Sequence, residues 1–148
     1  MSGVISNRAL LCCLTAWFSA QLAKFVIDGI RHRGWSLRDL LFGSGGMPSS
    51  HTAFVTSLAV MAARMRGLDS LEFTICFVLC FVVMTDAIGV RRETGRQGSA
   101  INMLMNWFAG QHPETEDSGD LKERVGHSPL EVLIGFLWGL GCGLLFKL

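Results

Sequence analysis

The stretch Leu71–Val90, LEFTICFVLCFVVMTDAIGV, decides the fold class of this chain. Its middle, from Phe73 to Thr85, carries no charged residue. A helix of about 20 apolar residues crosses the hydrocarbon core of a bilayer, so this stretch is long enough to span a membrane. Asp86 lies near its C-terminal end and begins a cluster that is unusually polar for the end of a span. The stretch therefore predicts a membrane helix with a polar end.

Three further apolar segments surround this stretch along the chain. They are Ala9–Ile30, Ser49–Met65 and Pro129–Leu148, of which the second is only just long enough to cross a bilayer. Together the segments predict an all-α protein, a polytopic membrane bundle of about four spanning helices with short interfacial or re-entrant helices. Residues 1–148 form a single integral membrane domain in this interpretation.

The composition also favours a membrane protein. Hydrophobic residues make up 50% of the chain and the mean hydropathy is +0.41. The net charge of +1 gives no sign of a nucleic-acid partner. The cysteines lie inside apolar runs without a Cys/His set in a polar loop, so we expect neither structural zinc nor a disulfide framework. We interpret them as small packing residues: Cys12, Cys13, Cys76, Cys80 and Cys142.

The first apolar segment allows two interpretations. Arg8 ahead of a short apolar core, with small residues at Ser19 and Ala20, also fits a signal peptide. We favour a helix that stays in the mature protein, because we interpret Lys24 and Arg31 near its end as functional residues.

The segments between the predicted spans are polar or short. Trp35 and Leu37–Phe42 suggest a short interfacial helix, and Arg91–Gly98 suggests a polar turn. Ser99–Phe108 is apolar but too short for a span, so we expect a re-entrant or interfacial helix. His112–Glu123 is acidic and is typical of a surface loop.

An alternating path through the membrane brings the polar residues to one face. The C-terminal ends of the first and third helices lie on one side of the membrane. The N-terminal ends of the second and last helices lie on that same side. If Ser99–Phe108 crossed the membrane fully, His127 would instead lie on the opposite side. Positive charges are more numerous on the shared side, which places it in the cytoplasm, although charges that bind phosphate bias this count. The gathered residues are Lys24, Arg31, Ser49, Ser50, His51, Asp86, Arg91, Arg92, His127 and Glu131.

The tetrapeptide Pro48-Ser49-Ser50-His51 is typical of a helix start. Serine hydroxyls commonly cap the first N–H groups of a helix, and this accounts for Ser49 and Ser50 without any function. It does not explain His51 at a membrane edge. We favour a site in which the helix N-terminus attracts phosphate, the serines donate hydrogen bonds and His51 supplies a proton.

Basic residues near this site suit a phosphate ligand. Lys24 and Arg31 are separated by two helical turns and therefore share a helix face, where they either reach out to lipid headgroups or hold phosphate oxygens. Arg91 and Arg92 either flank the membrane as ordinary basic residues or bind phosphate bidentately. Asp86 is placed to orient one of these two arginines.

The start of the last segment has two competing interpretations. Ser128, Pro129 and Glu131 fit a capping box, in which the glutamate binds backbone only. In the alternative, Glu131 hydrogen-bonds His127 and orients it as a nucleophile, which requires His127 to fold back over the first helical turn. We favour a functional His127, and the sequence leaves the role of Glu131 open.

These motifs resemble the type 2 phosphatidic acid phosphatase (PAP2) family, which shares its active-site plan with vanadium-dependent haloperoxidases. The family pattern is Lys-x6-Arg-Pro, then Pro-Ser-Gly-His, then Ser-Arg-x5-His-x3-Asp. Lys24-x6-Arg31, Pro48–His51 and His127-x3-Glu131 match in turn, with His32, serine and glutamate as departures. The Ser-Arg half is missing, and the chain as a whole is similar to the divergent branch of the family.

The resemblance implies a PAP2-like fold and a two-step hydrolysis without a cofactor or metal. His127 would attack phosphorus and form a phosphohistidine, with its imidazole held by Glu131. His51 would protonate the leaving oxygen and then activate water. The developing negative charge would be stabilised by Lys24, Arg31, Arg91, Arg92, Ser49 and Ser50.

Three functions therefore compete. The first is a membrane phosphatase for a lipid phosphomonoester or diphosphate, the second a lipid-phosphate binding or transport protein, and the third a purely structural membrane protein. We expect a bacterial inner membrane location and membrane lipids as neighbours.

Gly135, Gly139 and Gly143 recur every four residues and form a smooth helix face. That face either packs inside the chain or forms a homodimer.

Overall fold

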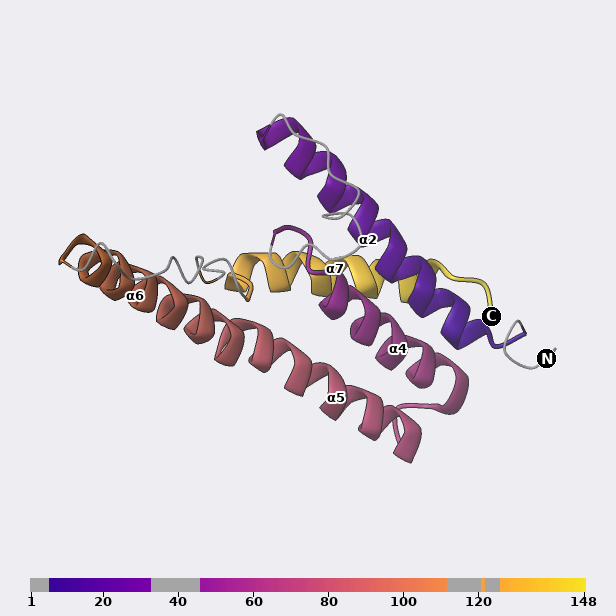
Figure 1. Ribbon diagram of the computed structural model, residues 1–148. Coiled ribbons are helices and arrows are strands. Elements are labelled where there is room, and N and C mark those ends of the chain that lie inside the picture. The colour runs from indigo at the N-terminus through magenta and orange to yellow at the C-terminus, as the bar shows by residue number, and fades with distance from the viewer. Residues whose placement is uncertain (1–5, 33–45, 112–120, 122–125) are drawn as a thin grey trace.

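The computed structural model describes residues 6–32, 46–111, 121 and 126–148, and all regular structure in these residues is helical (Figure 1). This confirms the all-α prediction and places the apolar segments in helices close to their predicted bounds. The interfacial helix predicted at Leu37–Phe42 and the acidic loop lie outside the described residues, apart from Leu121. The helices are α2 (Arg8–His32), α4 (Ser50–Arg66), α5 (Leu71–Ile88), α6 (Val90–Gln111) and α7 (Pro129–Leu145).

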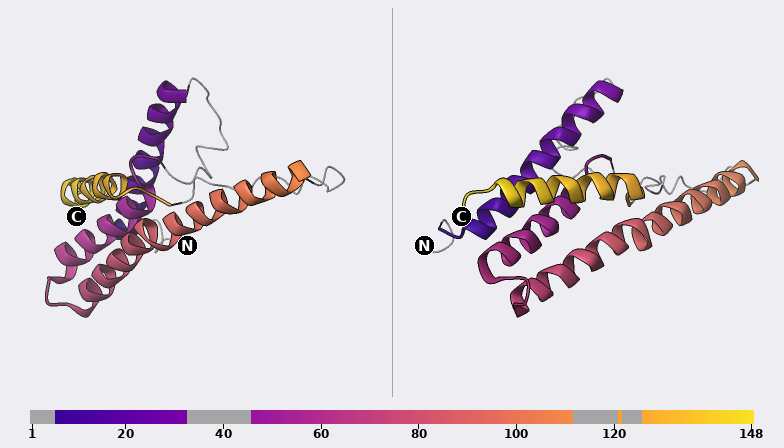
Figure 2. Two further views of the ribbon diagram at one scale, coloured as in Figure 1. Left: turned by 90° about the vertical axis from the view of Figure 1, so that its left-hand side faces the viewer. Right: turned by 180° about the vertical axis from the view of Figure 1, so that it is seen from behind.

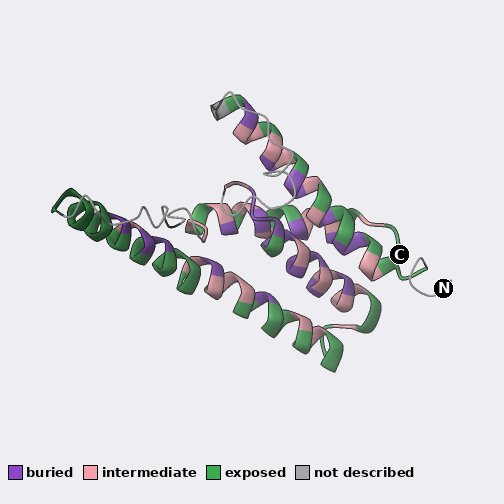
Figure 3. Ribbon diagram, in the orientation of Figure 1, coloured by how far each residue is buried: buried purple, intermediate pink, exposed green. Residues whose placement is uncertain are grey.

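The helix α4 lies at the centre of the fold. It runs alongside α2 and α5, and α7 crosses it on a further side, as the views in Figures 1 and 2 together show. Small side chains allow this close approach, including the buried Cys13, Ala16 and Ala20 of α2 and Ala53 of α4. Figure 3 shows the buried residues gathered along α4 and its neighbours, while the far end of α6 is exposed.

The three glycines of α7 are buried against α4. A Cβ atom built on Gly135 would lie 2.5 Å from the backbone oxygen of Ser49, and one on Gly143 would lie 2.7 Å from the Val60 side chain. Between them, Gly139 meets the backbone of Ala53. The two backbones therefore pack directly on each other, as small residues every four positions allow. This packing is inside the chain, which is the first of the two arrangements that the sequence left open for this face.

The far end of α7 is held by a side chain of α4. Nη1 of Arg64 donates to the carbonyl oxygen of Gly143 at 2.6 Å and to that of Phe146 at 2.7 Å. The last carbonyl groups of a helix have no partners within the helix, and a cation there also interacts favourably with the helix dipole. Arg64 and the glycine face thus fix α7 along its whole length.

Within the described residues, two apolar stretches are long enough to cross a membrane. They are Arg8–Ile30 in α2 and Leu71–Gln111, which runs through α5 and α6. The helix α7 is apolar but shorter, at 17 residues, and α4 has the same length with a mixed composition. The prediction of membrane-length apolar helices is thereby confirmed for two stretches.

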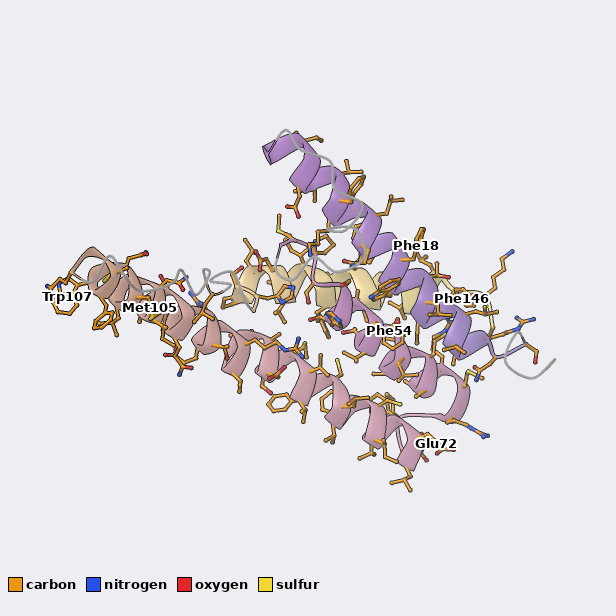
Figure 4. All side chains as sticks on the ribbon, viewed as in Figure 1. Phe18, Phe54, Glu72, Met105, Trp107 and Phe146 are labelled. Carbon is orange, nitrogen blue, oxygen red and sulfur yellow. The ribbon has the colours of Figure 1, made fainter. Side chains whose placement is uncertain are left out.

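The polar turn predicted at Arg91–Gly98 is wrong, because these residues form the first turns of α6. Arginine, glutamate and glutamine are good helix formers, and Arg96 and Glu93 pair at 3.4 Å across one turn. Gly95 and Gly98, which suggested a turn, are instead buried on one face of the helix. Ser99–Phe108 continues the same helix, and its exposed Met105 and Trp107 lie far from the bundle (Figure 4).

The close packing of α7 on α4 predicts a position-specific effect of adding one methyl group. Gly139→Ala should lower the free energy of unfolding by about 1–3 kcal/mol, because the new methyl collides with the Ala53 backbone. Gly141 has nothing within 4 Å of its Cβ position, so Gly141→Ala should be neutral or stabilising by about 0.5–1 kcal/mol. Thermal unfolding of both variants in detergent measures the difference. Equal effects would contradict the packing described.

Candidate functional site

Backbone hydrogen bonds join three distant segments at one end of the bundle. The Ser49 N–H donates to the carbonyl oxygen of Glu131 at 3.2 Å, and the His127 N–H donates to that of Ala87 at 3.1 Å. Gly126, with a φ of +87°, lies so close to α6 that a Cβ atom would be 2.5 Å from the Arg92 nitrogen. Backbone rather than flexible side chains therefore sets the relative positions of the two predicted catalytic histidines.

A cavity of about 150 Å³ lies where these segments meet. It brings together five residues that the sequence predicted for the site, and they come from α4, α5, α6 and the start of α7. Its remaining wall is apolar. The predicted residues that line it are Ser49, His51, Asp86, Arg91 and His127, and the apolar ones are Phe54, Val55, Val83 and Ala87.

The N-terminus of α4 borders this cavity and has no side-chain cap among the described residues. Ser49 occupies the N-cap position with extended backbone, but its side chain accepts no hydrogen bond from the first turn. Instead, the Ser49 hydroxyl oxygen accepts from Oγ1 of Thr52 at 2.9 Å. The simple capping role of Ser49 is therefore absent within the described residues. The N–H groups of the first turn, with the positive end of the helix dipole, are the kind of group that binds an anion.

The N-terminus of α7, in contrast, is closed by its own residues. The Ser128 N–H donates to Oε2 of Glu131 at 2.9 Å, and the Glu131 N–H donates to the Ser128 hydroxyl at 3.3 Å. This is the reciprocal capping box, the first of the two interpretations that the sequence left open. Of the two helix starts at the site, only that of α7 has a side-chain cap among the described residues.

His127 lies beside the cavity with a buried imidazole nitrogen. Its Nδ1 has no hydrogen-bond partner among the described residues, and Oε2 of Glu131 is bound to backbone. Burial lowers the pKa of His127 below its ordinary value, and the Glu131 carboxylate opposes this shift. The further causes that lower it are the charges of Lys24, His51 and Arg91. A neutral imidazole at pH 7 can act as a nucleophile or a base.

Asp86 orients Arg91, as the sequence suggested. Nε of Arg91 donates to Oδ2 of Asp86 at 2.6 Å, across the junction of α5 and α6. Both side chains line the cavity, so the guanidinium is held beside the two histidines. A guanidinium oriented in this way presents its remaining N–H groups to a ligand, as bidentate phosphate binding requires.

The other predicted site residues are not among those that line the cavity. Lys24 is buried on α2, and its charge acts on both His51 and His127. Ser50 is buried in the first turn of α4, while Arg92 is exposed on α6. Arg31 belongs to the last turn of α2, but its side chain lies outside the described part of the structure.

Sequence reasoning missed the apolar wall of the cavity, although helical periodicity contained the signal. Phe54 and Val55 follow His51 by one helical turn, and Val83 precedes Asp86 by one turn, so each shares a face with a predicted site residue. Figure 4 shows Phe54 within the bundle. Gly126 and the Ala87 carbonyl were also missed, because their contacts are made between segments distant in sequence.

In the part of the chain that the structure describes, no group of three or more His, Cys, Asp or Glu side chains could hold a metal ion. The polar groups at the cavity are instead cations, imidazoles and helix N–H groups, with Asp86 already paired to Arg91. This donor set suits an anion.

Comparison with known proteins agrees with the motifs. The sequence profile of the divergent PAP2 family matches residues 5–142. The chain belongs to the divergent PAP2 family. It is 39% identical over 148 residues to the uncharacterized membrane protein YuiD of Bacillus subtilis (strain 168), an alignment that covers 93% of this chain and 92% of YuiD. No solved structure matches.

The environment of His127 predicts how this divergent PAP2 protein responds to pH. We expect the imidazole to titrate below its ordinary pKa, which is about 6.5, because burial disfavours the charged form. The unfolded chain then binds more protons than the folded chain, so His127 contributes stability above that value and the contribution is lost as pH falls. NMR titration of histidine-labelled protein, assigned with His127→Gln, measures the pKa. Titration at or above the ordinary value would contradict the burial described.

Proposed function

We propose that this protein is a membrane phosphatase that hydrolyses a lipid phosphomonoester or diphosphate through a phosphohistidine. The observation that carries the proposal is a cavity that His51 and His127 share, with Arg91 of α6 held there by Asp86 of α5. Two histidines and an oriented guanidinium are the groups needed to attack, protonate and stabilise a phosphoryl group.

In the first step, an imidazole nitrogen of His127 attacks phosphorus and the bond from phosphorus to the lipid oxygen breaks. His51 gives its proton to that leaving oxygen. In the second step, His51 takes a proton from water, and the resulting hydroxide attacks the phosphohistidine. Inorganic phosphate leaves and both histidines return to their starting states. The reaction needs no metal ion in this scheme.

Several groups would stabilise the charge on the phosphoryl oxygens. The open first turn of α4, with Ser49 and Ser50, would donate hydrogen bonds, and Arg91 would bind two oxygens at once. Lys24 would add a buried positive charge that already acts on both histidines. Arg31 and Arg92 are proposed as outer contacts on the path of the substrate.

The apolar wall supports a lipid substrate. A cavity of about 150 Å³ is small beside drug-sized pockets of roughly 300–1,000 Å³, so it suits a phosphate group rather than a large headgroup. Phe54 and Val83 stand where α4 and α5 meet and are only partly buried, so hydrocarbon attached to the phosphate would continue along these side chains.

We further propose that α2, α4, α5 and α7 all cross a bacterial inner membrane, with the site near one surface. The membrane-length stretches of α2 and α5 support this topology, as does the membrane-protein description of the relative from Bacillus subtilis. The exposed apolar side chains on α2 and α5 would then face lipid.

One observation favours a second function, which is lipid-phosphate binding or transport without hydrolysis. Oε2 of Glu131 serves the capping box, and Nδ1 of His127 has no partner in the described residues. A phosphohistidine mechanism usually needs a group that holds the imidazole in one tautomer. A site without such a group still binds phosphate.

The two functions are separated by phosphate release from a panel of lipid phosphates. We expect purified protein in detergent, with EDTA present, to release phosphate from at least one lipid, and His127→Ala to abolish release because the nucleophile is gone. His112→Ala, at a histidine outside the predicted site, serves as the matched control. Thermal unfolding must show that all three proteins are folded. A folded wild-type protein that binds lipid phosphate and releases none would establish the binding function instead.

A further inference from the structure

Lys24 is an unusually buried cation. Only 6% of its surface is exposed, although it belongs to the apolar helix α2. A lysine removed from water tends to lose its proton unless a negative group compensates its charge. The role given to Lys24 in phosphate binding requires the charged form, so the residues around its ammonium group matter for the site.

Asp28 lies next to Lys24 in space as well as on α2. The two are four residues apart and therefore stand on one face of the helix. The Cβ position of Gly46 is 3.0 Å from Cε of Lys24 and 3.2 Å from Oδ2 of Asp28, so both side chains converge on the same point. In the sequence, Asp28 is an isolated carboxylate within an apolar segment, and the motifs give it no role.

Gly46 covers this pair with bare backbone. Its φ of +87° is a conformation that favours glycine, and any side chain there would press on Lys24 and Asp28. Two residues later the chain enters the Pro48–His51 segment at the start of α4. The side chains of Lys24 and Asp28 therefore lie on the side of α2 that faces the segment leading into α4.

We propose that Asp28 is a positioning residue that keeps Lys24 charged and fixed at the phosphate site, an inference that rests on the proposed function. Asp28 itself does not touch the substrate. Its carboxylate compensates the buried positive charge of Lys24, and the charged Lys24 then binds the phosphate.

A double-mutant cycle tests this with inorganic phosphate as the probe and full-length protein in detergent. Asp28→Asn should weaken phosphate binding about tenfold, because the buried charge of Lys24 then loses the nearby carboxylate that compensates it. In the Lys24→Met background the same substitution should have no further effect, because Asp28 acts through Lys24. Asp28→Glu, which keeps the carboxylate, should retain most of the affinity. Glu72→Gln, at an exposed carboxylate of α5, is the matched control.

Each outcome decides the matter. Equal weakening by Asp28→Asn in both backgrounds would show a merely structural role and overturn the proposal, as would no weakening in the wild-type background. If Asp28→Asn does not fold, Asp28→Ser carries the same cycle. Suppose that Asp28→Asn weakens phosphate binding only when Lys24 is present, but the protein releases no phosphate from lipids. The phosphatase function would then be overturned, and the role of Asp28 would stand. A folded wild-type protein that binds no phosphate would overturn both.

Discussion

The direct contact between the backbones of α4 and α7 is the constraint on which the rest of the structure depends. Glycines at three successive turns of α7 leave no side chain between the helices, so their register is set by the shapes of the backbones. The same register brings the carbonyl of Glu131 to the N–H of Ser49. His127 and His51 therefore come together as a consequence of helix packing, and the cavity is an extension of the core.

The two helix starts at the site differ in a way that matters for chemistry. The helix α7 caps its own first turn with a capping box, whereas α4 has no side-chain cap among the described residues. Polar groups in an apolar protein are costly unless they are satisfied, so a helix start left open beside two histidines and an arginine is a feature retained at some cost to stability. In the proposed function, this helix start is the part of the fold that binds the anionic phosphate.

Much of this arrangement could be predicted from the sequence, because it follows from local rules. Apolar length located the helices, and the alternation of their directions placed His51, Asp86, Arg91 and His127 at one end. The polar turn at Arg91–Gly98 was wrong because glycines in a polar run look like turn residues, whereas here they face a packed surface. The choice between the two roles of Glu131 depended on where a single carboxylate points. That choice, and the contact of Gly126 with α6, are properties of three-dimensional packing that no local pattern contains.

The position of α7 at the end of the chain has a consequence for how the protein is made. In the proposed topology, helices enter the membrane in the order of synthesis and then associate, so α2, α4 and α5 are available before α7 exists. The cavity needs His127 from the start of α7, and it closes only when the glycine face docks on α4. An incomplete or undocked chain therefore has the polar side chains of α4, α5 and α6 but not the complete cavity. Docking of the last helix is therefore the step that completes the cavity.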